Sequence, residues 1–223
     1  MTKVKKTKDY VLKNISSIKT SVKYEFHKWK KQLVVVDEII FIAVALLFWI
    51  FWPDVLVIAV YLLLYPYLFL TARKSSLNHL YTASIVALIW MVIAKSQYGY
   101  NQEMLIVLGF NLFPLFSWAI GLFGVYIIYS HWEHIIKKTS LLKKILLFIA
   151  FYWPILIFAE TIAYHIFNIH NLSTAIYAGL PICNCLHAPI WMQISYFALG
   201  PIYLIICELI GLKNPHIIRK EKL

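Results

Sequence analysis

The sequence predicts an all-α fold: a polytopic transmembrane helical bundle of about six spans, with a basic amphipathic N-terminal helix and a broken or re-entrant segment before the last span. Of the 223 residues, 61% are hydrophobic, 17% are aromatic and only 14% are charged. A single soluble core of this length cannot bury so much apolar surface. We therefore expect one transmembrane domain over residues 33–212, between a basic cytoplasmic arm (1–32) and a basic cytoplasmic tail (213–223).

The N-terminal arm contains a predicted amphipathic helix from Leu12 to Leu33. Its apolar residues recur at intervals of three and four with lysines between them, which is the spacing of one face of an α-helix. A basic helix with Phe26 and Trp29 on its apolar side is suited to the surface of an anionic leaflet. The alternative is that this helix packs on the cytoplasmic ends of its own bundle.

Apolar runs of sufficient length predict six membrane spans in the rest of the chain. They cover residues 33–52, 55–70, 77–94, 104–130, 144–167 and 189–212. Pro66 should bend or end the second span, and Asn111 with Pro114 should break the fourth. Because residues 175–212 are too long for one span, we expect residues 175–187 to form the broken or re-entrant segment.

The basic residues indicate how the chain is oriented. Every lysine and arginine except Lys95 lies in the arm, in the tail or in a loop on the same side of the predicted spans. Because basic residues favour the cytoplasmic side, both termini should be cytoplasmic, in a multi-pass protein of the cell membrane surrounded by membrane lipid. The same distribution argues against nucleic acid as a partner, although the formal net charge is +11.

Glu160 is the strongest candidate for chemistry, because it is an ionisable residue inside the fifth predicted span. A charged carboxylate within the membrane is costly, so Glu160 should face the bundle interior and often carry a proton. A protonated carboxyl group can act as a general acid on a lipid-soluble substrate, and His165 is the second predicted catalytic residue. The alternative is a structural tie, in which Glu160 bonds to His165, Asn111 or a backbone carbonyl.

Other polar and aromatic residues lie near the outer mouth of the predicted bundle, where a substrate would enter. The predicted substrate-binding residues are Asn111, Trp153, Tyr164, Asn168, His170, Asn171, Asn184, His187 and Trp191.

The three cysteines do not predict a disulfide framework, because their number is odd and only one residue separates Cys183 from Cys185. We expect both of these cysteines to pack as small buried residues. A metal site formed by Cys183, Cys185 and His187 is the weaker alternative, because the cysteine pairs that bind zinc are usually about two to four residues apart.

Three features follow one another from Glu160 onwards: an intramembrane glutamate on a late helix, a short polar loop from His170 to Tyr177 that contains an aromatic residue, and an Ala-Gly-Leu-Pro turn from Ala178 to Pro181. In these features the chain resembles the membrane lycopene cyclases and the related carotenoid hydratases, although it lacks the acidic Pro-x-Glu-Glu signature of the cyclases. The resemblance implies cofactor-free acid chemistry on a long isoprenoid, with Glu160 as the proton donor.

These patterns predict an integral membrane protein with an intramembrane site near the outer leaflet, which binds or acts on a hydrophobic isoprenoid- or carotenoid-like molecule by cofactor-free acid catalysis. The absence of G-x-S-x-G, H-E-x-x-H and phosphate-binding glycine motifs disfavours hydrolytic and nucleotide-driven chemistry. The alternative is a non-catalytic membrane subunit within a homo- or hetero-oligomer, or a transporter of a small solute.

Overall fold

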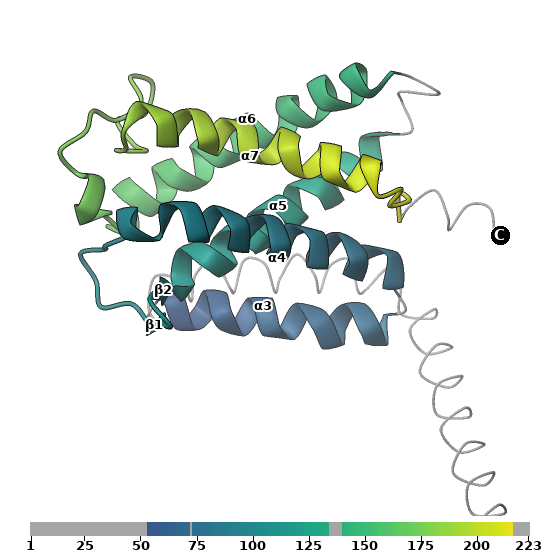
Figure 1. Cartoon of the computed structure of the whole chain (residues 1–223), viewed down its shortest axis with the longest axis horizontal. Helices are drawn as coiled ribbons and strands as arrows, with labels where there is room; N and C mark the ends of the chain where they lie inside the picture. The colour runs from purple at the N-terminus through teal and green to yellow at the C-terminus, as the bar shows by residue number, and fades with distance from the viewer. Residues whose placement is uncertain (1–52, 72, 134–139, 216–223) are drawn as a thin grey trace, which may run out of the picture. The chain divides into compact units, whose positions relative to one another are not determined.

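The structure, a computed structural model, describes residues 53–71, 73–133 and 140–215 (Figure 1). All of these residues belong to one unit of the chain. Five helices in this part are long and apolar enough to cross a membrane, which fits the predicted multi-pass helical protein. The predicted arm helix (12–33), the first predicted span (33–52) and residues 216–223 of the tail lie outside the described residues.

Helices α3 (Pro53–Leu70) and α4 (Lys74–Ala94) correspond to the second and third predicted spans. Helix α3 continues through Pro66 and ends four residues later, close to where the proline was expected to end it. The Thr71 hydroxyl donates to the carbonyl of Tyr67 at 2.7 Å and so covers one of the carbonyl groups at the end of α3. Helix α4 is followed by the 3₁₀ turn η1 (Lys95–Gln97).

The fourth predicted span is wrong in its first part, because residues 104–111 are not helical and α5 covers Leu112–Trp132. Strands β1 (Ile106–Val107) and β2 (Phe110–Asn111) form a short antiparallel hairpin instead. Asn111 caps α5, because its Oδ1 accepts a hydrogen bond from the backbone N–H of Phe113 at 3.0 Å. Pro114 lies in the first turn of α5, where no intrahelical N–H is needed, so neither residue breaks the helix.

Helices α6 (Leu141–His165) and α7 (Ile190–Leu209) pack against each other where α7 contains Gly200 and Pro201. The ring of Tyr152 occupies the space beside Gly200, where an added Cβ would overlap with the ring carbons. Pro201 has no N–H for the carbonyl of Phe197, four residues earlier in α7. The indole N–H of Trp153 donates to this carbonyl at 3.1 Å, so a side chain of α6 replaces the bond that the proline removes.

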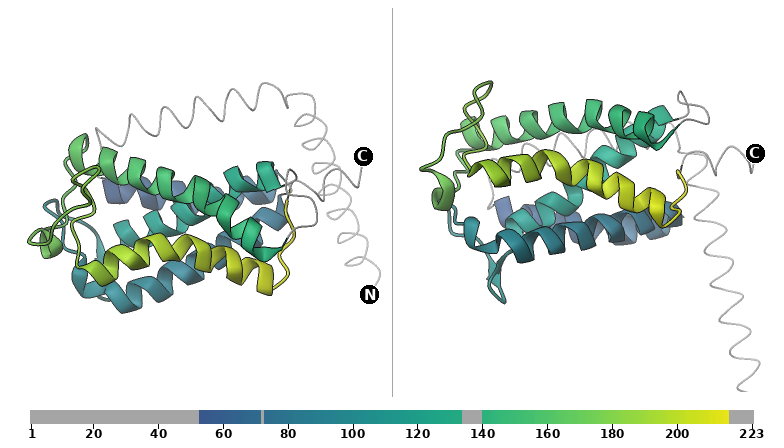
Figure 2. Two further views of the ribbon diagram at one scale, coloured as in Figure 1. Left: turned by 90° about the horizontal axis from the view of Figure 1, so that it is seen from above. Right: turned by 45° about the horizontal axis from the view of Figure 1, so that its top comes forward.

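Between His165 and Ile190 the chain contains no α-helix, only the 3₁₀ turn η3 (Leu172–Thr174), so the helical chain is interrupted where we expected a break before the last span. This segment lies at the same end of the helices as the β1–β2 hairpin (Figures 1 and 2). We call this end, formed by residues 95–111 and 166–189, the loop end.

A group of charged residues joins three helices at the opposite end. The ammonium group of Lys144 in α6 lies 3.0 Å from a carboxylate oxygen of Glu133, at the end of α5, and 2.8 Å from one of Glu208 in α7. The side-chain amide of Asn214 donates to Glu133 and to the carbonyl of Ser130. We call this the charged end.

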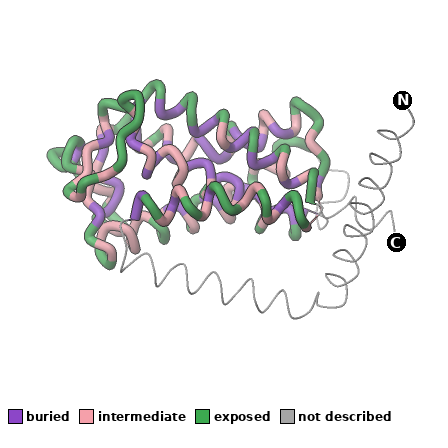
Figure 3. The backbone as a smooth tube through the Cα atoms, turned by 90° about the horizontal axis from the view of Figure 1, so that it is seen from below, coloured by how far each residue is buried: buried purple, intermediate pink, exposed green. Residues whose placement is uncertain are grey.

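Helix α5 is central among the described helices, because it contacts α3, α4, α6 and α7. Buried and exposed residues alternate along each helix, so every helix has one face in the core and one face outside it (Figure 3). Many residues of the exposed faces are large and apolar, among them Leu63, Phe69, Ile93 and Phe158. Exposed apolar side chains on several helices fit contact with lipid.

Candidate functional site

Glu160 lies in α6, near the loop end, and is half-buried. Its carboxyl group is close enough to four phenol groups to interact with them electrostatically, those of Tyr98, Tyr100, Tyr152 and Tyr196. These tyrosines come from the loop end, from α6 itself and from α7. Within the described residues, Glu160 makes no hydrogen bond or ion pair.

The two tyrosines of the loop end are neutral groups beside this carboxyl. Burial raises the pKa of Tyr98 and of Tyr100, and the negative charge of Glu160 adds to the rise. Both phenols therefore keep their protons at physiological pH and can donate hydrogen bonds.

Aromatic N–H groups fix the position of the Tyr98 hydroxyl. The indole nitrogens of Trp90 and Trp118 donate to its oxygen at 2.7 and 3.0 Å. Because the oxygen accepts two hydrogen bonds, its own proton is left for a further acceptor. Tyr98 and Tyr100 are not among the predicted site residues, because a tyrosine in a loop carries no sequence signal of such a role.

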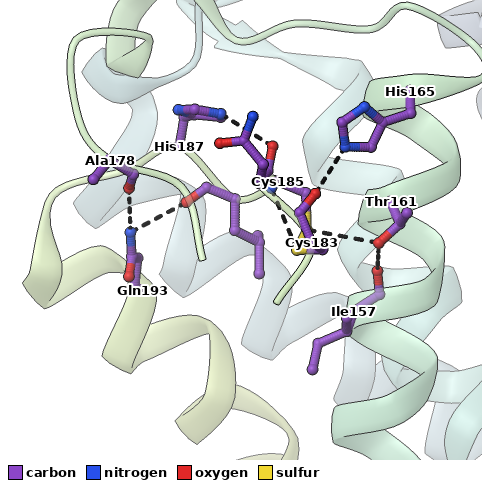
Figure 4. The surroundings of a disulfide bond; sticks show 10 residues. Ile157, Thr161, His165, Ala178, Cys183, Cys185, His187 and Gln193 are labelled. Carbon is purple, nitrogen blue, oxygen red and sulfur yellow. Dashed lines mark hydrogen bonds between the residues drawn. A yellow bond between two sulfur atoms is a disulfide. The ribbon is translucent and has the colours of Figure 1, made fainter. Parts of the chain in front are cut away.

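The structure does not bring the predicted partners of Glu160 to its carboxyl group. His165 places its Nε2 2.8 Å from the carbonyl oxygen of Cys183, and Asn111 caps α5. The structural tie between Glu160 and these two side chains is therefore not present in the described part of the chain. His165 instead connects the end of α6 to the loop that contains the cysteines (Figure 4).

Two asparagine side chains hold the loops of the loop end together. The Asn171 amide accepts from one backbone N–H and donates to one carbonyl within residues 97–99, at 3.1 and 2.7 Å. The Asn101 amide does the same within residues 168–170, at 2.8 and 2.9 Å, and one of its contacts is the carbonyl of Asn168. The predicted substrate-binding residues Asn168 and Asn171 therefore lie in a link between two loops.

Tyr164, His170 and His187 do come together, as a stack of rings at the end of α6. The Tyr164 ring is 4.1 Å from that of His170 and 5.0 Å from that of His187, measured between centroids, with 23° between the planes in each case. Both ring nitrogens of His187 face backbone carbonyls, those of Tyr177 at 2.8 Å and Asn184 at 3.2 Å. These contacts attach residues 170–187 to α6, and the nitrogens of His187 are engaged with the backbone.

Cys183 and Cys185 form a disulfide, which corrects the expectation that they pack as separate residues (Figure 4). A turn over residues 180–185 brings the two sulfurs together, and residue spacing alone does not reveal such a turn. A bonded sulfur is not the thiolate that a metal site needs, so the alternative metal site with His187 is not formed. Across the described residues, no group of three His, Cys, Asp or Glu side chains is arranged to hold a metal ion.

The two predicted tryptophans lie on helix surfaces. Trp153 is 42% exposed and donates to the carbonyl of Phe197, as described above. Trp191 is 44% exposed, and its ring centroid lies 6.0 Å from that of Trp90.

Comparisons with family models, with curated proteins and with solved structures give no match to this chain. The resemblance to enzymes of carotenoid synthesis therefore stays a prediction.

Proposed function

We propose that this chain is an integral membrane protein that binds a hydrophobic molecule beside Glu160 and acts on it as a general acid. The observation that carries the proposal is a carboxyl group without a hydrogen-bond partner among the described residues, surrounded by tyrosines within an apolar helical bundle. In such a place the protonated carboxyl is favoured, because the charged form is poorly solvated. A protonated carboxyl in apolar surroundings is the state that proton donation requires.

The surrounding aromatic groups suit this chemistry. Once Glu160 has given up its proton, the nearby phenols of Tyr98 and Tyr100 stay neutral and add no second negative charge beside the carboxylate. Aromatic ring faces stabilise a positive charge that develops on the substrate. We therefore propose an unsaturated isoprenoid- or carotenoid-like molecule as the substrate, because protonation of its double bond gives a carbocation. The sequence resemblance supports the same class.

We further propose that the protein lies in the cell membrane with its loop end outside and both termini in the cytoplasm. The distribution of basic residues supports this orientation, since Arg73, Lys74, Lys144 and Lys213 lie toward the charged end. A disulfide at the loop end supports it independently, because disulfides persist in oxidising compartments.

One observation favours the alternative of a non-catalytic subunit or a carrier of a small solute. Several side chains expected to bind a substrate contact the backbone instead, namely those of Asn111, His165, His170, Asn171 and His187. These side chains are therefore committed to the structure of the loop end. The test below separates the two functions.

The test compares Glu160→Gln, Glu160→Leu and the control Glu103→Gln, whose glutamate is exposed at the loop end. Glutamine keeps the size of the side chain but has no proton to give, so conversion of an acyclic polyene in vesicles should fall by about 100-fold or more. Both Glu160 variants should fold with an unchanged or higher melting temperature, because no hydrogen bond of a described residue is lost. Glu103→Gln should keep full activity.

Full conversion by Glu160→Gln would contradict the proposal of acid catalysis and would favour the non-catalytic function. A lowered melting temperature in Glu160→Leu alone, with Glu160→Gln as stable as the unchanged protein, would indicate the structural tie instead.

A further inference from the structure

Hydrogen bonds hold the turn that contains Cys183 and Cys185 in addition to the disulfide. The backbone N–H of Leu180 donates to the carbonyl of Cys185 at 2.8 Å, and the N–H groups of Cys183 and Asn184 donate to the carbonyl of Leu180 at 3.2 and 2.8 Å. The Nε2 of Gln193 in α7 lies 2.9 to 3.3 Å from three carbonyl oxygens of the same loop, and two of these contacts are drawn in Figure 4. The bridge spans one residue, so it restricts the unfolded chain less than a bridge across a long loop does.

The two cysteines differ in how accessible they are to a thiol outside the turn. Cys185 is fully buried, whereas Cys183 is half-buried and lines an open groove between α6 and the turn. Near the turn the groove is also lined by Ile157, Thr161 and Ile182. A thiolate that approaches along this side reaches Cys183 and not Cys185, and partial exposure is a feature of reactive cysteines.

Each sulfur also has a neighbour that suits its reduced form. The backbone N–H of Cys185 points at the sulfur of Cys183 at 3.3 Å, and such a donor stabilises a thiolate. The Thr161 hydroxyl donates to the carbonyl of Ile157 at 2.6 Å, so its oxygen presents a lone pair to the sulfur of Cys185, 3.7 Å away. A reduced Cys185 can therefore donate its S–H to Thr161.

We propose that Cys183 and Cys185 form a thiol–disulfide exchange site that oxidises a dithiol polypeptide at the loop end. A thiolate of the polypeptide attacks the sulfur of Cys183, the bond to Cys185 breaks, and Cys185 takes up a proton. The second thiolate of the polypeptide then attacks the polypeptide's own sulfur in the mixed disulfide and releases Cys183 as a thiolate. The site does not depend on the acid function of Glu160.

The exchange is balanced in electrons and protons. The two thiols of the polypeptide lose two electrons and two protons and become a disulfide. The bond between Cys183 and Cys185 takes up the two electrons and becomes a thiol on Cys185 and a thiolate on Cys183, with one proton on Cys185 and the other released to solvent. The same steps in reverse restore the bridge from a disulfide of a second polypeptide.

The test uses the full chain in lipid nanodiscs with Cys207→Ser, which removes the free and buried third cysteine. The oxidised protein is mixed with a reduced peptide that contains two cysteines, and thiols are counted by alkylation and mass spectrometry. We expect one equivalent of peptide disulfide and two alkylated cysteines, at 183 and 185. The melting temperature of the reduced protein should stay within about 3 °C of the oxidised one, since the backbone bonds hold the turn.

Two single variants identify the sulfur that is attacked. With an aromatic disulfide reagent, Cys183 in Cys185→Ser should react about tenfold faster than Cys185 in Cys183→Ser, because Cys185 is buried. A bridge that resists the peptide and dithiothreitol until the protein unfolds would overturn the proposal. So would reduction that unfolds the protein, and equal rates in the two variants would contradict attack at Cys183.

Discussion

Trp153 shows at the scale of one residue how a proline is accommodated inside a helix. Its indole N–H donates to the Phe197 carbonyl that Pro201 leaves without a partner. Trp153→Phe keeps the aromatic ring but removes this donor, so the free energy of unfolding should fall by about 1 to 2 kcal/mol. Thermal unfolding in detergent measures this. Trp191→Phe is the control, because Trp191 has similar exposure and no indole hydrogen bond to a described residue, and an equal loss in both variants would contradict the argument.

Single residues also show how far the candidate site could be predicted. Glu160 could be found from the sequence because a carboxyl group in an apolar run is costly and therefore conspicuous. Tyr98 and Tyr100 could not, because they lie in the loop after α4, far from Glu160 in the sequence, and approach it only in the folded chain. The disulfide between Cys183 and Cys185 depends on the turn at residues 180–185, and the spacing of the cysteines is equally compatible with two separate thiols.

At the scale of one element, the start of α5 depends on its cap. Asn111→Ala should lower the free energy of unfolding by about 0.5 to 2 kcal/mol, because the N–H of Phe113 loses its acceptor. Asn111→Asp keeps an oxygen at the same place and should preserve stability, since a carboxylate is also favourable at a helix N-terminus. Thermal unfolding of both variants tests this. A loss of stability in Asn111→Asp as large as in Asn111→Ala would contradict the role as a cap.

The helices differ in how well their bounds follow from the sequence. Apolar runs between polar segments placed α3, α4, α6 and α7 within a few residues of the observed ends. The start of α5 was misplaced because Leu105, Ile106 and Val107 are as apolar as a membrane span, although they form part of an exposed loop and hairpin. Hydropathy cannot distinguish the two, and the asparagine at position 111 carries the more informative signal.

For the whole molecule, the relative placement of the loops agrees with the predicted topology. Residues 97–101 and 168–172 were expected on one side of the membrane, and they are hydrogen-bonded to each other. We predict that a cysteine at Gln102 is labelled by an impermeant reagent in intact cells, whereas one at Lys138 is not, in a chain without its native cysteines. Lys138 should become labelled once the cells are opened. Labelling at Lys138 in intact cells would contradict the proposed orientation.

The link made by Asn101 and Asn171 also has a consequence for the order of folding. Its partners are 69 and 72 residues apart in the chain, and both α5 and α6 lie between them. During synthesis, residues 97–101 therefore emerge long before the segment that holds them. Until α6 and the segment after it have been made, the loop that contains Tyr98 and Tyr100 lacks the hydrogen bonds of this link. The surroundings of Glu160 are thus among the last parts of the described unit to be assembled, although two of its four tyrosines are made early.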